Sequence, residues 1–231
     1  MIATMLQNPH ISEYLLSLEP DLPEYLEELR ETAEAAQVPI IRREAQALLR
    51  FLVDLRRPEH ILEVGTAVGF SACYLSELAP RASITTIEKV PAKIAEAKKN
   101  FARFGKERIR LLEGDAADVL RELSARKQVY DFVFLDAAKA QYGVYLPYLF
   151  SMLAEGGLLI TDNVLQEGSL ADSKFTVTRR NRTIHMRMRE YVGQLFAWDG
   201  LTSVLLPVGD GMALSVRRTK ERENGEKRNE E

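Results

Sequence analysis

The chain alternates short apolar runs with segments whose apolar residues recur at helical spacing. The apolar runs are bounded by turn residues and predict buried strands over 61–64, 83–88, 108–113, 130–135 and 158–161. Between them, helical spacing predicts a helix from Phe70 and helices over 91–104, 116–123 and 142–153. Two last runs, 201–207 and 211–216, predict a closing hairpin. This alternation predicts an α/β fold with a doubly wound, mostly parallel seven-stranded sheet.

Helices are also expected before and after this core. Residues 11–36 predict two short helices broken at Pro20 and Pro23, and 42–55 predict a third. Residues 38–41 form an expected extended linker, because the residue before a proline avoids helical geometry. A loop over 164–178 precedes a helix over 179–196. We expect one domain over 1–217, with a helical cap (1–57), a core (58–217) and a disordered charged tail (218–231).

Composition narrows the class of protein but not its activity. The 231 residues are 46% hydrophobic and 28% charged, as in an ordinary soluble globular protein. No apolar run is long enough to span a bilayer, and the first residues lack the pattern of a signal peptide, so we expect a cytoplasmic protein with no membrane partner. Cys73 is the single cysteine, which excludes an internal disulfide. A net charge of −3 gives no global reason to expect nucleic acid, although a local patch can hide in that mean.

The first predicted strand runs into a glycine turn, in the stretch HILEVGTAVGFS over 60–71. Glycines let backbone approach a ligand, and the following helix presents free N–H groups at its start. The spacing is G-x-x-x-G, whereas a dinucleotide site has G-x-G-x-x-G. Glu63, two residues before Gly65, suits a ligand with a positive amino group. The pattern resembles motif I of the class I S-adenosylmethionine methyltransferases; a tight turn in another doubly wound protein is the alternative.

Other predicted strands also end in polar residues, and parallel strands bring these ends together. Glu88 can accept the two hydroxyls of a ribose, or be an ordinary charge at a strand end. Asp115-Ala116 would lie where an adenine edge sits, although Asp115 can instead cap the next helix. Asp136 and the pair Asp162-Asn163 end two further strands.

Asp136, Asp162 and Asn163 offer three oxygen ligands for a hard divalent ion such as Mg²⁺. Lys139 follows Asp136 by three residues. It is either a solvated lysine at a helix start or a catalytic group, acting as a base or as a charge beside a developing oxyanion.

Five segments together resemble the metal-dependent O-methyltransferases of the catechol and caffeoyl-CoA type: HILEVGTAVGFSACYLSELAP, ITTIEK, LLEGDA, YDFVFLDAAKAQYGVYL and GGLLITDNVL. The resemblance runs from about residue 38 to 216 and implies the class I, Rossmann-like methyltransferase fold. It implies that Mg²⁺ is held by Asp136, Asp162 and Asn163, and that Lys139 is the candidate base. It also implies that S-adenosylmethionine is contacted by Ile41, Glu63, Gly65, Ser71, Glu88, Ala116 and Asp136. A homodimer is favoured by the same resemblance.

The acceptor is suggested by cations near the last helix. No acidic residue interrupts the run that contains Lys174, Arg179, Arg180, Arg182, Arg187 and Arg189, and Arg42 and Arg43 lie in the linker region. A solvated helix face with subunit salt bridges explains them, and so does a surface that contacts nucleic-acid phosphates. The V-P-I-x-x-x-E-A linker and the Arg179-Arg180-Asn181-Arg182 run are similar to the bacterial branch that methylates 5-hydroxyuridine in tRNA to 5-methoxyuridine.

We therefore hypothesise tRNA as the acceptor, at wobble position 34. The alternatives are a small catechol or caffeoyl-CoA-like phenol, whose CoA phosphates would also suit the cations, and a non-catalytic nucleotide-binding module.

Overall fold

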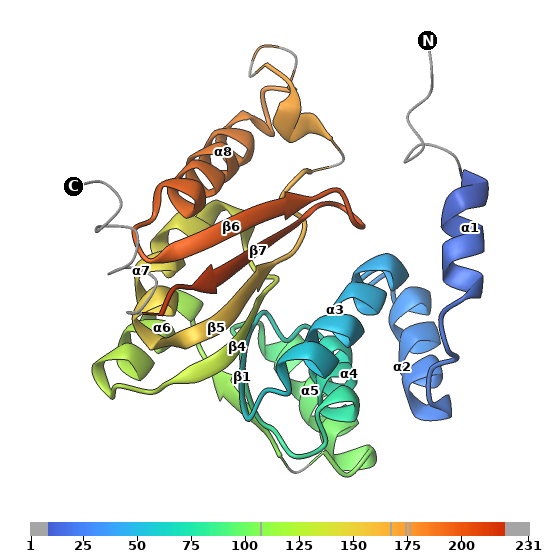
Figure 1. Ribbon diagram of the computed structural model, residues 1–231. Coiled ribbons are helices and arrows are strands. Elements are labelled where there is room, and N and C mark those ends of the chain that lie inside the picture. Colours follow the sequence, from blue (N-terminus) through green and yellow to red (C-terminus); the bar gives the residue numbers. More distant parts are fainter. Residues whose placement is uncertain (1–8, 107, 167, 174, 176, 220–231) are drawn as a thin grey trace.

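The computed structural model describes residues 9–106, 108–166, 168–173, 175 and 177–219. Lys174 and residues 220–231 of the expected tail lie outside the described residues. One sheet with the strand order β3-β2-β1-β4-β5-β7-β6 forms the centre (Figure 1). Its strands are β1 (His60–Val64), β2 (Ser83–Glu88), β3 (Ile109–Glu113), β4 (Tyr130–Leu135), β5 (Leu153–Thr161), β6 (Leu201–Leu206) and β7 (Met212–Arg217).

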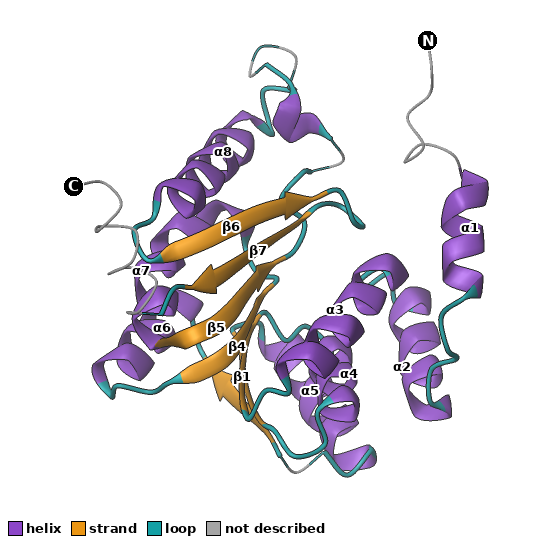
Figure 2. Ribbon diagram, in the orientation of Figure 1, coloured by secondary structure: helices purple, strands orange, loops and turns teal. Residues whose placement is uncertain are grey.

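Helices cover both faces of this sheet (Figure 2). The helices are α1 (Pro9–Ser17), α2 (Glu24–Ala35), α3 (Arg43–Arg56), α4 (Phe70–Leu78), α5 (Pro91–Arg103), α6 (Ala116–Ala125), α7 (Tyr142–Met152) and α8 (Arg182–Ala197). Two 3₁₀ turns are η2 (Lys139–Gln141) and η3 (Ser169–Ala171). Helices α3, α4 and α5 lie on one face with α2 behind them, and α6, α7 and α8 lie on the other.

The central strands are mostly apolar because both of their faces are buried. In β4, Phe132 and Phe134 join the core beneath α3 and α4, whereas Val133 and Leu135 join the core beneath α6 and α7. This alternation follows from the two-residue period of a strand. The predicted doubly wound sheet is therefore confirmed.

The strand order places the carboxyl ends of β1 and β4 next to each other. Strands β1 to β5 run parallel, and the chain leaves β1 toward β2 and later returns to the other side of β1 as β4. A ligand crevice is expected at such a reversal, outside the carboxyl ends of the strands. Strand β7 is antiparallel to both β5 and β6, which confirms the predicted hairpin.

Several predicted boundaries differ from the structure, and the differences at β5, α7 and α8 have identifiable causes. Strand β5 begins at Leu153 rather than at 158, because Gly156 and Gly157 form an irregularity inside the strand where the register with β4 shifts. Helix α7 therefore ends one residue early, at Met152. Helix α8 begins at Arg182 rather than 179, since residues 179–181 form a turn before it.

Candidate active site

A cavity of about 580 Å³ lies at the carboxyl ends of β1, β2, β4 and β5. Every residue predicted for the site lines it except Glu63: the lining includes Ile41, Gly65, Ser71, Glu88, Ala116, Asp136, Lys139, Asp162 and Asn163. Segments far apart in sequence therefore meet there, as expected of parallel strand ends. The roles assigned to these residues remain predictions.

The glycine turn between β1 and α4 needs glycine at two positions. Gly65 has φ +107°, and a Cβ there would lie 1.9 Å from the carbonyl oxygen of Asp136. Gly69 has φ +90°, and a Cβ there would lie 2.6 Å from the ring of Phe101. The turn thus packs directly on the end of β4 and on α5, and a side chain at either position would force backbone or ring apart.

Glu88 has a structural role that the sequence did not reveal. Its Oε2 accepts a hydrogen bond from the Ala67 amide at 2.9 Å. Its Oε1 accepts from the amides of Lys89 and Val90 at 2.8 and 3.0 Å. The carboxylate therefore holds the glycine turn and the start of the β2–α5 connection together, and it still has acceptor capacity toward the cavity.

Glu63 lies behind the cavity wall. It is fully buried, and its Oε2 accepts a hydrogen bond from the Thr86 hydroxyl, which in turn contacts the Thr66 hydroxyl at 2.6 Å. Burial raises the pKa of Glu63 to about 7, while the Ser71 and Thr86 hydroxyls oppose that change. Its Oε1 has no hydrogen-bond partner among the described residues, and the predicted contact of Glu63 with the donor stays a prediction.

Asp115 caps helix α6. Its Oδ1 accepts from the Ala117 amide at 3.0 Å, and its Oδ2 lies 3.2 Å from Lys89 Nζ. These contacts, the amide first, hold the pKa of Asp115 below its usual value. The capping alternative is thus confirmed, and Ala116, rather than Asp115, lines the cavity.

Asp136, Asp162 and Asn163 form a compact acidic group. Asn163 Nδ2 donates to Asp136 Oδ1 at 3.3 Å, and the Asn163 amide donates to Asp162 Oδ1 at 2.7 Å. Burial raises the pKa of both carboxyls, that of Asp162 to about 7, and the charge of Asp136 adds to the effect on Asp162.

This donor set fits a hard divalent cation. Two carboxylates buried side by side repel each other, so a cation between them would be favoured over two desolvated charges. The set rests on two carboxylates and one amide: no group of three or more His, Cys, Asp or Glu residues suited to a metal is found in the part of the chain that the structure describes.

Lys139 contacts a residue that the sequence did not point to. Its Nζ lies 3.6 Å from Oδ2 of Asp210, in the β6–β7 turn. The sequence marked this Gly-Asp-Gly stretch only as a hairpin turn, and nothing local to it signals that it would fold back onto η2.

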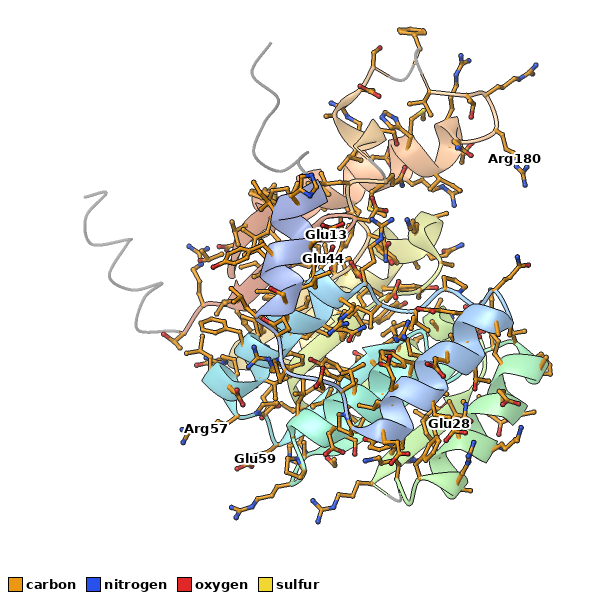
Figure 3. The ribbon with its side chains drawn as sticks, turned by 90° about the vertical axis from the view of Figure 1, so that its right-hand side faces the viewer. Glu13, Glu28, Glu44, Arg57, Glu59 and Arg180 are labelled. Atoms are coloured by element: carbon orange, nitrogen blue, oxygen red, sulfur yellow. The ribbon has the colours of Figure 1, made fainter. Side chains whose placement is uncertain are left out.

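The arginines of 179–189 are exposed, and one of them contacts η2. Arg187 donates to the carbonyl of Ala140, the residue after Lys139, at 3.2 Å, and Arg189 donates to the carbonyl of Asp172 at 3.0 Å. Arg180 projects outward from the segment before α8 (Figure 3). Across the described residues none of these arginines forms a salt bridge with a carboxylate, and the alternative of salt bridges between subunits stays a prediction.

A family model described as O-methyltransferase matches residues 16–218. The chain belongs to the O-methyltransferase family. It is 32% identical to O-methyltransferase ankF of Aspergillus thermomutatus over 176 residues, which cover 71% of this chain and 73% of the relative. It is 31% identical to a catechol O-methyltransferase of Mycobacterium tuberculosis over 193 residues, which cover 80% and 85%.

Solved structures of O-methyltransferases share the fold. A Staphylococcus aureus protein provisionally assigned as a caffeoyl-CoA O-methyltransferase matches with a TM-score of 0.83 and 33% identity, over 90% of this chain and 99% of that one. A Bacillus cereus O-methyltransferase in complex with S-adenosylhomocysteine matches with a TM-score of 0.79 and 24% identity, over 90% and 97%. The predicted activity class, a S-adenosylmethionine-dependent O-methyltransferase, is confirmed.

No helix in the described part of this O-methyltransferase is long and apolar enough to cross a membrane.

Proposed function

We propose that this O-methyltransferase moves the methyl group of S-adenosylmethionine to a hydroxyl that has a second oxygen beside it, with Mg²⁺ as the metal and tRNA 5-hydroxyuridine as the acceptor. The observation that carries the first part is the meeting of Asp136, Asp162, Asn163 and Lys139 in one cavity with the glycine turn. A donor site and an oxygen-rich acidic group in the same cavity suit a reaction in which a cationic donor meets a chelating acceptor.

The donor would lie along the β1 and β2 ends. Glu88, fixed by three backbone amides, would accept the ribose hydroxyls, and Ala116 would border the adenine. Gly65 and Ser71 would border the amino-acid part of the donor. Glu63, which is buried and does not line the cavity, would attract the ammonium group of the donor electrostatically. These residues bind and orient the donor, and alignment of the sulfonium methyl is their contribution to rate.

Asp136, Asp162 and Asn163 would hold the metal, which supplies Lewis acidity toward the acceptor hydroxyl when bound. Lys139 would take the hydroxyl proton or place its charge beside the oxygen anion. The burial of Asp162 lowers the local dielectric constant and would strengthen its interaction with a bound cation.

The acceptor proposal is supported by the arginines outside the cavity. They are exposed and lack carboxylate partners among the described residues, and Arg187 contacts the turn that carries Lys139. A phosphodiester backbone would meet such a surface while its base enters the cavity. A 5-hydroxyuridine presents a hydroxyl beside a carbonyl, the vicinal oxygens that the donor set requires.

A second candidate acceptor is a small catechol or a caffeoyl-CoA-like phenol. Two relatives named catechol O-methyltransferase, from Niastella koreensis and Mycobacterium tuberculosis, support it. A small catechol uses the cavity but leaves most of the arginine surface without a role, whereas the phosphates of a CoA ester would also suit that surface.

We also propose a homodimer. Leu15 on α1, Leu18 just after it, and Phe51 and Leu55 on α3 are more than half exposed, and α1 packs against α3. We propose that these side chains form the apolar face that a second copy covers. Leu55→Glu should reduce the mass measured by light scattering to that of a monomer, and an unchanged mass would count against this face.

The test is methyl transfer from labelled S-adenosylmethionine to tRNA that carries 5-hydroxyuridine, to the same tRNA with uridine, and to catechol. We expect transfer to the first only, its loss with EDTA and its return with Mg²⁺. Asp162→Ala should abolish transfer while binding of S-adenosylhomocysteine, measured by calorimetry, is retained. Transfer to catechol alone would establish the second candidate, and full activity of Asp162→Ala would remove the metal role.

A further inference from the structure

Lys139 is paired with a carboxylate from the turn between the last two strands, β6 and β7. Its Nζ lies 3.6 Å from Oδ2 of Asp210, which is 8% exposed, whereas about a third of the Lys139 side chain is exposed. We propose that Asp210 is a positioning residue that fixes the ammonium head of Lys139 at the acceptor side of the cavity. This inference rests on the proposed role of Lys139 in methyl transfer.

The position of Asp210 is itself fixed by the backbone. The Leu165 amide donates to the Asp210 carbonyl at 2.9 Å, and the Val164 amide donates to the Gly211 carbonyl at 3.0 Å. Gly211 has φ +85°, and a Cβ there would lie 2.3 Å from Leu165 Cγ. The β6–β7 turn is therefore clamped to the two residues that directly follow Asp162-Asn163. Asp210 keeps a constant relation to the proposed metal ligands.

A lysine needs such a partner more than most side chains. The flexible four-carbon side chain lets the ammonium group sample many positions, and in positions away from the acceptor this group cannot assist methyl transfer. Asp136 and Asp162 also attract Lys139, whose charge opposes the rise that burial causes in the pKa of both carboxyls. If those two carboxylates bind a cation, that cation would repel the ammonium head. Asp210 lies outside that set and would still hold it.

Asp210 also stands between two hollows. It lines a second hollow of about 370 Å³ together with Arg42, and Arg42 lines the main cavity as well, as does Lys139. The Lys139–Asp210 pair thus joins the wall of the main cavity to the wall of the second hollow, and an acceptor in the second hollow would lie next to this pair. A fixed cation at this border suits an acceptor oxygen that becomes negative as its proton leaves.

The kinetic test is a double-mutant cycle. Asp210→Asn should lower kcat about tenfold with KM for S-adenosylmethionine unchanged, and Asp210→Glu should recover part of the loss. Lys139→Ala should cost about 100-fold, the low end for loss of a proton-transfer group, and adding Asp210→Asn to it should cost nothing more. Asp199→Asn, which removes the carboxylate of an exposed pair with Arg218, is the matched control and should leave kcat unchanged.

A second test does not depend on the acceptor. The wild type and Asp210→Asn are treated briefly with an amine-acylating reagent, and labelled lysines are measured by mass spectrometry. Lys139 should be labelled several-fold faster in the variant, while Lys93, which lines the same cavity, should be labelled at the same rate. An unchanged rate at Lys139, or additive losses in the cycle, would overturn the proposal. If the wild type methylates no acceptor tried, the proposed function fails, and the labelling still decides the pairing.

Discussion

The tightest contact in the glycine turn predicts a graded response to alanine. Gly65→Ala adds a Cβ 1.9 Å from the Asp136 carbonyl oxygen at φ +107°. The backbone conformation costs about 1–2 kcal/mol for a residue with a side chain, and forcing an extra carbon into packed atoms costs about 1–3 kcal/mol, so the loss in unfolding free energy should be about 2–5 kcal/mol.

Two other glycines separate these causes. Gly105 has φ +62° with nothing within 4 Å of an added Cβ, so Gly105→Ala should lose only the conformational part, about 1–2 kcal/mol. Gly193 lies inside α8 with open space around it, so Gly193→Ala should stabilise the protein by about 0.5–1 kcal/mol. Urea unfolding of the three variants and the wild type measures the differences.

The clash also has a functional consequence. Relief requires the Asp136 carbonyl to move, and Asp136 is a proposed ligand of both donor and metal, so Gly65→Ala should also weaken binding of S-adenosylhomocysteine in calorimetry. Gly105→Ala should leave that binding unchanged. A Gly65→Ala variant that is no less stable than Gly105→Ala and that binds normally would refute the argument.

Three further properties follow from the charges and burial of other groups. Burial raises the pKa of Cys73 to about 12, so this thiol should react with Ellman's reagent only after unfolding, and rapid reaction in the native protein would contradict that burial. The Tyr25 hydroxyl, which donates to Glu77 at 2.7 Å, lowers the pKa of Glu77. A depressed carboxyl stabilises the fold above its unfolded pKa of about 4.3 and loses that contribution as pH falls through its folded pKa. The free energy of unfolding measured with urea should therefore fall on acidification more in the wild type than in Glu77→Gln, and the difference should be less than about 1 kcal/mol because the pair is partly exposed. The same pH dependence of the unfolding free energy in both proteins would refute this. Arg179→Glu with Arg180→Glu should weaken tRNA binding without changing turnover of a small acceptor, and should reduce the slope of log K against log salt by about 1 for each phosphate that the variant no longer neutralises. An unchanged slope would remove these arginines from the RNA surface.

The sheet could be predicted because burial on both faces leaves a continuous apolar run in each central strand. The convergence of Glu88, Asp136 and Asp162 could be predicted for a related reason, since parallel strands end at the same edge. What failed was local. Gly156 and Gly157 are usually chain breakers, yet here β5 continues through them by a shift in register, and that shift depends on its pairing with β4.

The sequence could not predict how deeply a side chain is buried or which distant residue it contacts. The glycine motif placed Glu63 near the ligand, but only the packed structure shows it behind the wall and bonded to Thr86. The residues around Asp210 in the sequence indicate only a turn. It becomes a partner of Lys139 because backbone hydrogen bonds hold the β6–β7 turn against residues 164–165. Contacts of this kind are set by how distant elements pack, so they leave no pattern in the segment that makes them.

The cavity contains an acidic group, and exposed arginines lie outside it. Asp136 and Asp162 are costly to bury as charged groups without a cation nearby, which favours a divalent metal between them, although Lys93, Lys139 and Arg42 line the same cavity. Outside, Arg179 and Arg180 are exposed without carboxylate partners in the described part of the chain, which favours an anion. An acceptor that carries phosphate outside the cavity and presents only neutral oxygens inside satisfies both regions. A free catechol satisfies the interior alone, so the salt dependence of turnover with the two acceptors should differ: steep for the RNA and shallow for the phenol.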